Sequence, residues 1–284
     1  MNSSDEIDVT TLFNAGSQNR ENQGPLVAHM PVDKYSYEYN MNHKFRGKAL
    51  IFNHEFFDLD FLKERKGTNV DRDSLMRTLK GLNFEVTDYN NFTTREIMDT
   101  LSKVAKEDHT DYDCICITVM SHGSTSFIFS KDTLYQHDSL WDHFTPDNCP
   151  TLAGKPKIFF IQACKGTGFD DGYTLPGTAI TETDASSCES SYKIPTYADF
   201  IVAHSTIPGF VSWRDKDKGS WFIQSLCQEL DEYGKKLDLL KLLTFVNQRV
   251  AVHYQTDSEF KQKQMPCISF MLTRLVYFTD KENK

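Results

Sequence analysis

The sequence has no long apolar run, no excess of basic residues and no metal-ligand spacing among its cysteines and histidines. No apolar stretch approaches the roughly 20 residues that a transmembrane helix needs. The first residues also lack the basic and apolar regions of a secretory signal. A net charge of −9 argues against nucleic acids and anionic membranes as partners, because both are bound through lysine and arginine. We therefore expect a cytoplasmic protein that binds neither a membrane nor a nucleic acid.

The seven cysteines are an odd number and form no ligand cluster, so a Cys/His metal-binding protein is not supported. In a reducing compartment they stay thiols. Cys114 and Cys116 are two positions apart in an apolar run, so they share one face of a strand and are expected to be small buried hydrophobes.

Two apolar runs stop abruptly at reactive side chains. Residues 157–163 follow Pro156 and end at Cys164, and residues 114–120 end at His122 and Gly123. Such runs are typical of buried central strands, and ligands of α/β sheets bind at the carboxyl ends of the strands. A thiol and an imidazole at two strand ends can act as a nucleophile and its acid/base partner, and the small residue Gly123 leaves room for an oxyanion site. Taken singly, a cysteine such as Cys164 is more often a buried structural residue, and a histidine such as His122 is more often a hydrogen-bonded loop residue than a base. The pair at two strand ends is more specific, but by itself it leaves both interpretations open.

Strands and helices alternate along the rest of the chain, which predicts an α/β fold with a mainly parallel sheet and helices on both faces. Residues 1–40 are polar and without periodicity and are expected to be disordered, so that the fold begins near Arg46. Residues 167–194 are rich in Gly, Ser, Thr and Asp and are expected to be an exposed linker. The other predicted elements are a strand at 48–53, a helix with the stripe Val70, Leu75, Leu79 and Leu82, a strand at 84–87, a helix with the capping box Thr93 and Glu96, a strand at 199–206, helices capped by Ser220 and by Asp238, and a final strand at 267–272 and 275–278.

Residues 162–166, Gln-Ala-Cys-Lys-Gly, resemble the active-site signature of the caspases, and His122 lies upstream at about the separation found in that family. The likeness extends from Arg46 to near the end of the chain and is greatest to insect effector caspases. It is carried further by residues 65–71, 121–123, 154–157, 212–214 and 219–222. The resemblance implies a cysteine endopeptidase that cuts after aspartate, with an α/β/α sandwich fold and without a metal or organic cofactor.

The roles of particular residues are carried over from the resemblance. Cys164 would be the nucleophile and His122 the general acid/base, and the backbone N–H groups of Gly123 and Cys164 would form the oxyanion hole. The aspartate pocket would be lined by Arg65, Gln162 and Arg214, beside Ser212. Two guanidinium groups and an amide suit a carboxylate, since they offer several charge-assisted hydrogen bonds. The remaining subsites would be formed by Val211, Trp213, Trp221 and Asp215, with Phe260 in the loop that closes the farthest one.

Three residues depart from the family pattern. Lys165 replaces the usual Arg, Gln or Gly after the cysteine and loses the planar guanidinium fork, so the anchoring of its loop is in question. Val211 stands where many effector caspases have an aromatic residue, which predicts a roomier second subsite. Asp215 stands where effector caspases commonly carry an asparagine that binds an acid four places before the cleaved bond. A carboxylate there should repel that acid unless Lys216 or Lys218 compensates for its charge.

The linker has a candidate processing site after Asp184 in Thr-Glu-Thr-Asp, and Asp8 is a second candidate in the amino-terminal segment. The resemblance then divides the chain into a short disordered prodomain (1–40), a large subunit (41–184) and a small subunit (185–284), which together form one catalytic domain (41–284). It also implies a dimer joined through the final strand, protein substrates with aspartate-containing loops, an upstream activating caspase and caspase inhibitor proteins. The expected function is that of an executioner caspase of apoptosis. The alternative is a catalytically silent homologue that binds and regulates active caspases.

Overall fold

The computed structural model describes residues 31–170 and 195–281, and a six-stranded sheet runs through its centre in the order β12-β8-β6-β3-β1-β2. Five strands are parallel, and only β12 runs antiparallel, beside β8. The strands are β1 (Lys48–Asn53), β2 (Glu85–Asn90), β3 (Ile115–Met120), β6 (Lys157–Gln162), β8 (Phe200–His204) and β12 (Cys267–Phe270). The predicted fold class is confirmed.

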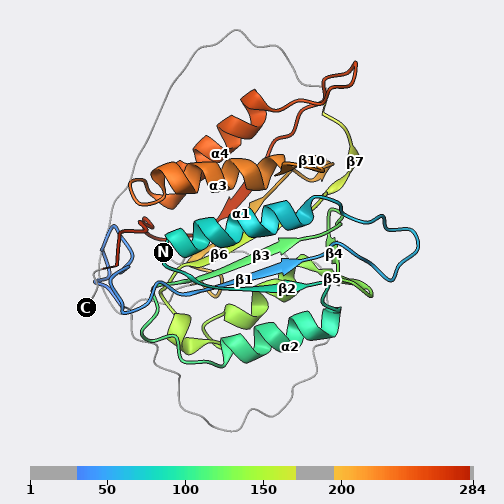
Figure 1. Ribbon diagram of the computed structural model, residues 1–284. Coiled ribbons are helices and arrows are strands. Elements are labelled where there is room, and N and C mark those ends of the chain that lie inside the picture. The colour runs from blue at the N-terminus through green and yellow to red at the C-terminus, as the bar shows by residue number, and fades with distance from the viewer. Residues whose placement is uncertain (1–30, 171–194, 282–284) are drawn as a thin grey trace, which may run out of the picture.

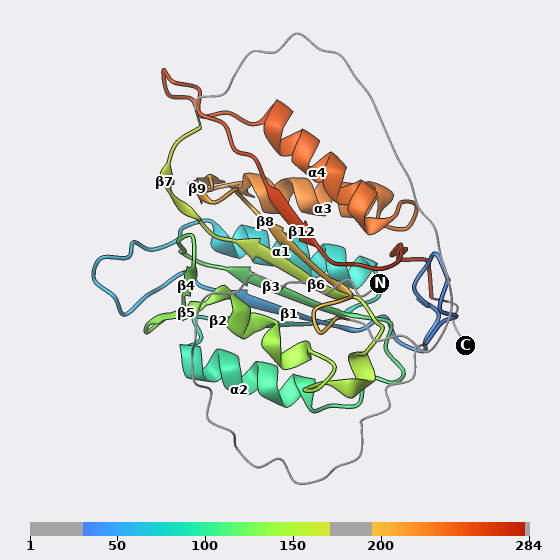
Figure 2. The ribbon, with the colours of Figure 1, turned by 180° about the vertical axis from the view of Figure 1, so that it is seen from behind.

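Helices cover both faces of the sheet, as Figures 1 and 2 show. One face carries α1 (Thr68–Gly81), α3 (Trp221–Tyr233) and α4 (Leu239–His253). The other carries α2 (Thr94–Ala105) with the short 3-10 turns η1 (His137–Leu140), η2 (Asp142–Phe144) and η3 (Pro150–Leu152). Short strand pairs lie outside the sheet: β4 (Phe127–Phe129) with β5 (Leu134–Gln136), β7 (Gly166–Gly168) with β9 (Gly209–Phe210), and β10 (Arg214–Asp215) with β11 (Gly219–Ser220). No helix in the described ranges is long and apolar enough to span a membrane.

The central strands are buried on both faces, which explains why their sequences are continuous apolar runs. In β3 and its flank, Cys114 and Cys116 pack into the core under α1, α3 and α4, whereas Ile115 and Ile117 pack into the core under α2. Burial raises the pKa of the Cys116 thiol far above its ordinary value. The prediction that Cys114 and Cys116 are buried hydrophobes is confirmed.

Side-chain capping decides where two of the helices begin. The hydroxyl of Thr93 and the carboxylate of Glu96 form the predicted capping box at α2, and Asp238 caps α4 by accepting from the N–H groups of Leu240 and Lys241. Ser220 precedes α3 as predicted, but its hydroxyl does not cap the helix, because it donates to Asp71 instead.

The buried stripe of α1 differs from the apolar one that the sequence suggested. Asp71, Leu75 and Leu79 are buried, whereas Val70 is 38 % exposed. Val70 is one residue, about 100° around a helix, away from Asp71. The prediction for Val70 was therefore wrong, because a charged residue occupies the inward position.

Both ends of the ordered chain differ from expectation, because they pair with each other. Tyr39 is buried and its N–H donates to the carbonyl of Leu275 at 3.0 Å, so the ordered fold begins before Arg46 and residues 31–40 are part of it. The predicted strand at 275–278 is absent, since β12 ends at Phe270. Leu275 forms an isolated parallel bridge with Glu38, and the N–H of Val276 donates to Asp238. The backbone N–H and C=O groups that a longer strand would use are thus hydrogen-bonded to partners outside the sheet.

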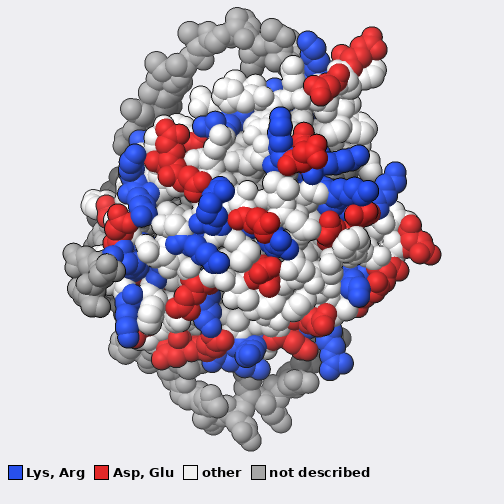
Figure 3. Space-filling view, in the orientation of Figure 1, with Lys and Arg blue, Asp and Glu red and all other residues white. Residues whose placement is uncertain are grey.

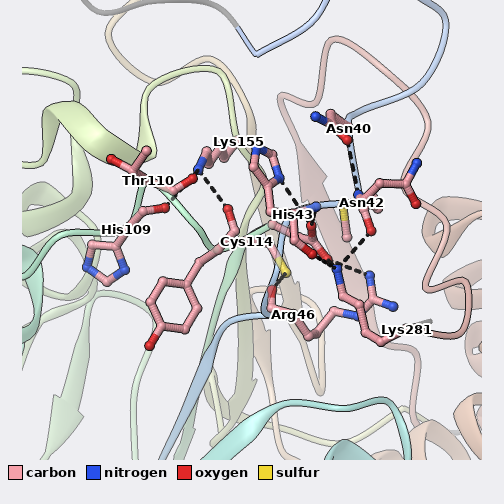
Figure 4. A network of polar contacts seen from close by, with 12 residues as sticks. Asn40, Asn42, His43, Arg46, His109, Thr110, Cys114, Lys155 and Lys281 are labelled. Atoms are coloured by element: carbon pink, nitrogen blue, oxygen red, sulfur yellow. Dashed lines mark hydrogen bonds and ion pairs between the residues drawn. The ribbon is translucent and has the colours of Figure 1, made fainter. Parts of the chain in front are cut away.

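A buried ion cluster ties the same two ends to the sheet (Figure 4). Asp113 is fully buried and accepts from Arg46 at 2.9 Å and from the His43 ring at 3.1 Å, and Lys281 of the carboxyl-terminal tail also contacts it. Next to it, Lys155 Nζ donates to three backbone carbonyls at 2.7 Å each. Buried charges are tolerated when they are paired and hydrogen-bonded in this way.

The predicted linker begins later than expected. Residues 166–168 form β7, which pairs in parallel with β9, so this part belongs to the ordered structure. Residues 171–194 lie outside the described residues, and so do the candidate processing sites at Asp184 and Asp8.

We expect Asp238→Ala to lower the free energy of unfolding by at least about 2 kcal/mol, because it removes the α4 cap and leaves the buried Val276 N–H unpaired. Asp238→Asn keeps one acceptor and should cost less than half as much. Denaturant titration measures both. Asp99→Ala, the same change at an exposed position of α2, is the control, and an equal loss in the control would contradict the assignment.

Candidate active site

Parallel pairing of β3 and β6 brings the predicted thiol and imidazole to one edge of the sheet. Met120 lies opposite Gln162, and the N–H of Ser121 donates to the Gln162 carbonyl at 3.0 Å. His122 and Cys164 each follow two residues after these paired ends. The structure therefore places both where the sequence predicted, at the carboxyl ends of neighbouring strands.

Gly123 lets the two strand-end loops approach closely. A Cβ atom on Gly123 would lie 2.9 Å from the Ala163 Cβ and 2.9 Å from the Cys164 carbonyl oxygen. Only glycine fits between these loops without displacing the backbone beside the thiol.

The surroundings of His122 determine its tautomer and charge. Nε2 lies 2.7 Å from the carbonyl oxygen of Lys63, so it carries the proton and donates, which leaves Nδ1 free to accept one. Burial lowers the pKa of His122, and the positive charges of Arg65 and Arg214 lower it further. The imidazole is thus a neutral base at neutral pH.

The thiol of Cys164 is partly exposed and is held by backbone. Its Sγ accepts from the N–H of Ser212 at 3.3 Å. Behind it, the hydroxyl of Ser205 donates to the Ala163 carbonyl at 3.0 Å and lies 3.3 Å from the Ala163 N–H. These contacts hold Ala163 in place. Ala163 precedes the cysteine and lies just beyond the last residue of β6 that pairs with β3.

Arg65 is a buried cation with an unused donor. The side chain is 1 % exposed, and Nη1 donates to the His54 carbonyl and to the Thr68 hydroxyl at 2.8 Å each. Nη2 is buried and has no hydrogen-bond partner among the described residues. Burial lowers the pKa of Arg65 to about 9, and the charge of Arg214 adds to this effect. A buried, unpaired guanidinium N–H is costly, and an anion in the pocket would relieve that cost.

Arg214 and Gln162 complete a cationic, hydrogen-bonding pocket. Arg214, on β10, donates from Nε to the Lys66 carbonyl at 2.8 Å, and burial lowers its pKa. Gln162 is 2 % exposed and donates to the Ser212 hydroxyl at 2.8 Å, while its other amide atom has no partner in the described ranges. The pocket adjoins the thiol, because the Ser212 residue whose hydroxyl accepts from Gln162 also donates its N–H to Cys164 Sγ.

Aromatic side chains line one side of this region. The rings of Trp213 and Trp221 stack with centroids 5.9 Å apart, and the chain of contacts continues to Tyr254 at 5.4 Å and Phe169 at 5.8 Å. Phe260 is 68 % exposed and takes part in no ring contact of the described residues, so the structure does not bring it to this wall.

The three departures from the family pattern have distinct surroundings. Lys165 is buried, and its loop is anchored through its backbone, which bonds to Phe210 and Gly209 on β9. Val211 donates its N–H to the Gly168 carbonyl at 3.0 Å. Asp215 is exposed and accepts from the N–H groups of Asp217 and Lys218, bonds that lower its pKa. Asp215 is therefore an anion at neutral pH.

Sequence reasoning missed several residues that hold the site. Lys63 acts through its carbonyl, Phe57 packs on the His122 ring at 5.0 Å, and Gln264 accepts from the Trp213 N–H at 2.6 Å while donating to the Ser205 carbonyl. These contacts depend on backbone atoms and long-range packing, which leave no local pattern in the sequence. Asp71 did leave a signal, as a charged residue in the apolar stripe of α1.

The "Caspase domain" family profile matches residues 46–277. The chain belongs to the caspase family. It is 52 % identical to caspase drICE of Drosophila melanogaster, over 96 % of this chain and 82 % of that one, and 48 % identical to caspase-1 of Spodoptera frugiperda, over 98 % and 96 %. The crystal structure of caspase-1 from Spodoptera frugiperda superposes with a TM-score of 0.84 at 49 % identity, covering 91 % of this chain and 99 % of that chain.

Membership in this family makes the chain a cysteine-type endopeptidase, and dimerisation and protein substrates are general properties of caspases. Within the described ranges, no group of three or more His, Cys, Asp or Glu side chains could hold a metal ion.

We expect the acid limb of kcat/KM to lie below pH 6.5, the ordinary pKa of histidine, because burial and two nearby cations lower the pKa of His122. Activity should then persist at pH 6.5 and fall at lower pH, as the imidazole takes up a proton. Phe57→Ala exposes the ring and should move this limb upward. Phe61→Ala, the same change at a 70 % exposed position of the same loop, is the control. A wild-type limb at or above 6.5, or equal shifts in both variants, would contradict the assignment.

Proposed function

We propose that this caspase cleaves protein substrates after aspartate as an executioner of apoptosis. The observation that carries the proposal is the buried Nη2 of Arg65, which has no hydrogen-bond partner among the described residues and lies in the pocket beside the partly exposed thiol of Cys164. A substrate aspartate that paired with Arg65 and Arg214 would satisfy this group through charge-assisted hydrogen bonds. On the face shown in Figure 3, acidic and basic side chains are interspersed. This supports recognition by a local pocket and not by a broad charged surface.

In the proposed reaction, the Cys164 sulfur attacks the backbone carbonyl carbon of the substrate aspartate, and its proton passes to Nδ1 of His122. The N–H groups of Gly123 and Cys164 stabilise the oxyanion. The tetrahedral intermediate collapses to a thioester, and the leaving amine takes the proton from His122. Water, deprotonated by the same imidazole, then hydrolyses the thioester and restores the thiol. The Lys63 carbonyl supports these steps, because it stabilises the imidazolium that forms and orients the ring.

Further residues would form the outer subsites, which bind the substrate residues that precede the aspartate. Trp213 and Trp221 form aromatic walls, Ser212 and Val211 border the extended substrate, and Phe260 would close the far subsite by a movement of its loop. Val211 is smaller than an aromatic residue and leaves a roomier second subsite.

Processing and assembly are proposed from the resemblance. Cleavage after Asp184 would give the large and small subunits, Asp8 would be the prodomain site, and an upstream caspase and inhibitor proteins would control the enzyme. Dimerisation through β12 is supported by its place at the sheet edge and by the exposure of Phe270, at 51 %, and Met271, at 39 %. An unpaired apolar edge strand invites pairing with a second copy.

The decisive measurement is hydrolysis of an aspartyl peptide and its asparaginyl twin by the wild type and by Cys164→Ala. We expect kcat/KM to fall by at least about a thousandfold for the asparaginyl peptide, because a neutral amide leaves the buried charge of Arg65 and the half-buried charge of Arg214 without a counter-ion. Cys164→Ala should lose both turnover and self-cleavage after Asp184 on a gel. A wild type that stays inert after cutting at Asp184 would instead favour the silent regulator.

Asp215 generates a separate prediction about the residue four places before the cleaved bond. The wild type should cleave peptides with aspartate or threonine there at similar rates, because the Asp215 carboxylate repels an acid. Asp215→Asn should raise the preference for aspartate a few-fold, and the gain should shrink with added salt, as expected for an exposed charge. Asp217→Asn is the matched control. A strong preference for aspartate in the wild type would contradict this reading.

A further inference from the structure

The β10–β11 hairpin, which carries Arg214 of the proposed pocket, is docked on the start of α1. Arg214 pairs with Ser220 across the hairpin and donates to the Lys66 carbonyl just before α1. Gly67, with φ +85°, touches the hairpin turn so closely that a Cβ there would lie 2.6 Å from the Lys216 carbonyl oxygen. The position of Arg214 thus depends on contacts between α1 and this hairpin.

Asp71 makes the central contact of this docking. Its side chain is buried, Oδ1 accepts from the N–H of Ser220 at 2.8 Å, and Oδ2 accepts from the Ser220 hydroxyl. Gly219, with φ +94°, lies against the same carboxylate, since a Cβ there would be 2.2 Å from Oδ1. Asp71 therefore binds Ser220, the sheet partner of Arg214, and lies close against Gly219 before it.

We propose that Asp71 is a positioning residue for the aspartate pocket, which holds Arg214 opposite Arg65 by fixing the hairpin through Ser220. This inference rests on the proposed function and adds a residue that touches neither the substrate nor the reacting atoms. The proposed linker cleavage leaves Asp71 on the large subunit and Ser220 on the small one, so the contact also sets how the two halves of the pocket meet.

The electrostatics agree with this role. Burial raises the pKa of Asp71 to about 6, while the Ser220 bonds and the charges of Arg65 and Arg214 lower it. At neutral pH the group is an anion that offsets part of the repulsion between the two guanidinium groups. On α3, burial raises the pKa of the Cys227 thiol to about 12, and the charges of Asp231 and Asp71 add to this effect. Hydrogen bonds to an ionised carboxylate are charge-assisted and therefore stronger than those to a neutral acceptor. The two bonds that Asp71 accepts thus fix the position of Ser220 firmly.

The test separates KM from kcat for an aspartyl peptide. Asp71→Ala removes both bonds to Ser220 and should raise KM about tenfold or more, with kcat changed less than about threefold, because the reacting groups lie on other loops. Asp71→Asn keeps an acceptor for the Ser220 N–H and should recover most of the loss. Leu75→Ala, in the core one turn further along α1, controls for lost stability and should lower the melting temperature without raising KM.

Each outcome decides the proposal. Equal KM changes in Asp71→Ala and Leu75→Ala, or an unchanged KM in Asp71→Ala, would overturn it. If Asp71→Ala does not fold, Ser220→Ala decides: a raised KM with kcat retained supports the role, and an unchanged KM rejects it. A wild type that does not cleave the aspartyl peptide would refute the proposed function itself, which distinguishes that failure from a failure of this inference.

Discussion

Parallel pairing of β3 with β6 is the constraint on which the site depends. Because Met120 and Gln162 are opposite each other, the loops that follow must leave the sheet side by side, and only the absence of a side chain at Gly123 allows them to approach as closely as they do. A shift of one residue in this pairing would turn every side chain of one strand to the other face. The two cores, one under α1, α3 and α4 and one under α2, oppose such a shift, so the hydrophobic packing secures the geometry of the chemistry.

The pocket beside the thiol shows what this stable frame makes possible. The buried Arg65 and the half-buried Arg214 are costly cations: burial lowers the pKa of both, and for Arg65 the charge of Arg214 adds to the effect. Backbone carbonyls and the carboxylate of Asp71 offset part of this cost, and one donor of Arg65 has no partner within the described part of the chain. Unfavourable electrostatics of this kind are found at functional sites, where the rest of the fold supplies the stability that offsets the cost. Here it leaves a place whose chemistry matches a carboxylate.

Sequence patterns whose hydrogen bonds stay within one segment predicted the structure well. Patterns whose residues bond to distant segments of the chain did not. Thr93 and Asp238 cap their helices as their sequences indicated, because a cap bonds to backbone only two or three residues away. Ser220 has the same local signal, yet its hydroxyl binds Asp71, 149 positions away in the chain. The stretch at 275–278 is apolar enough for a strand, but the segment at 37–39 and Asp238 take its backbone groups. Local propensity loses in these cases to contacts that only the fold creates.

The sequence by itself determined the α/β class, the two buried strands with Cys164 and His122 at their ends, and the family, because continuous apolar runs and a signature motif are local and specific. Only the tertiary structure decided the tautomer of His122, the burial of the Arg65 donor that finds no partner in the described ranges, the inward position of Asp71 and the joining of residues 31–46 to the carboxyl-terminal tail. Each of these depends on which backbone carbonyl, charge or ring lies nearby in space. That proximity follows from packing the whole chain, and no stretch of sequence records it.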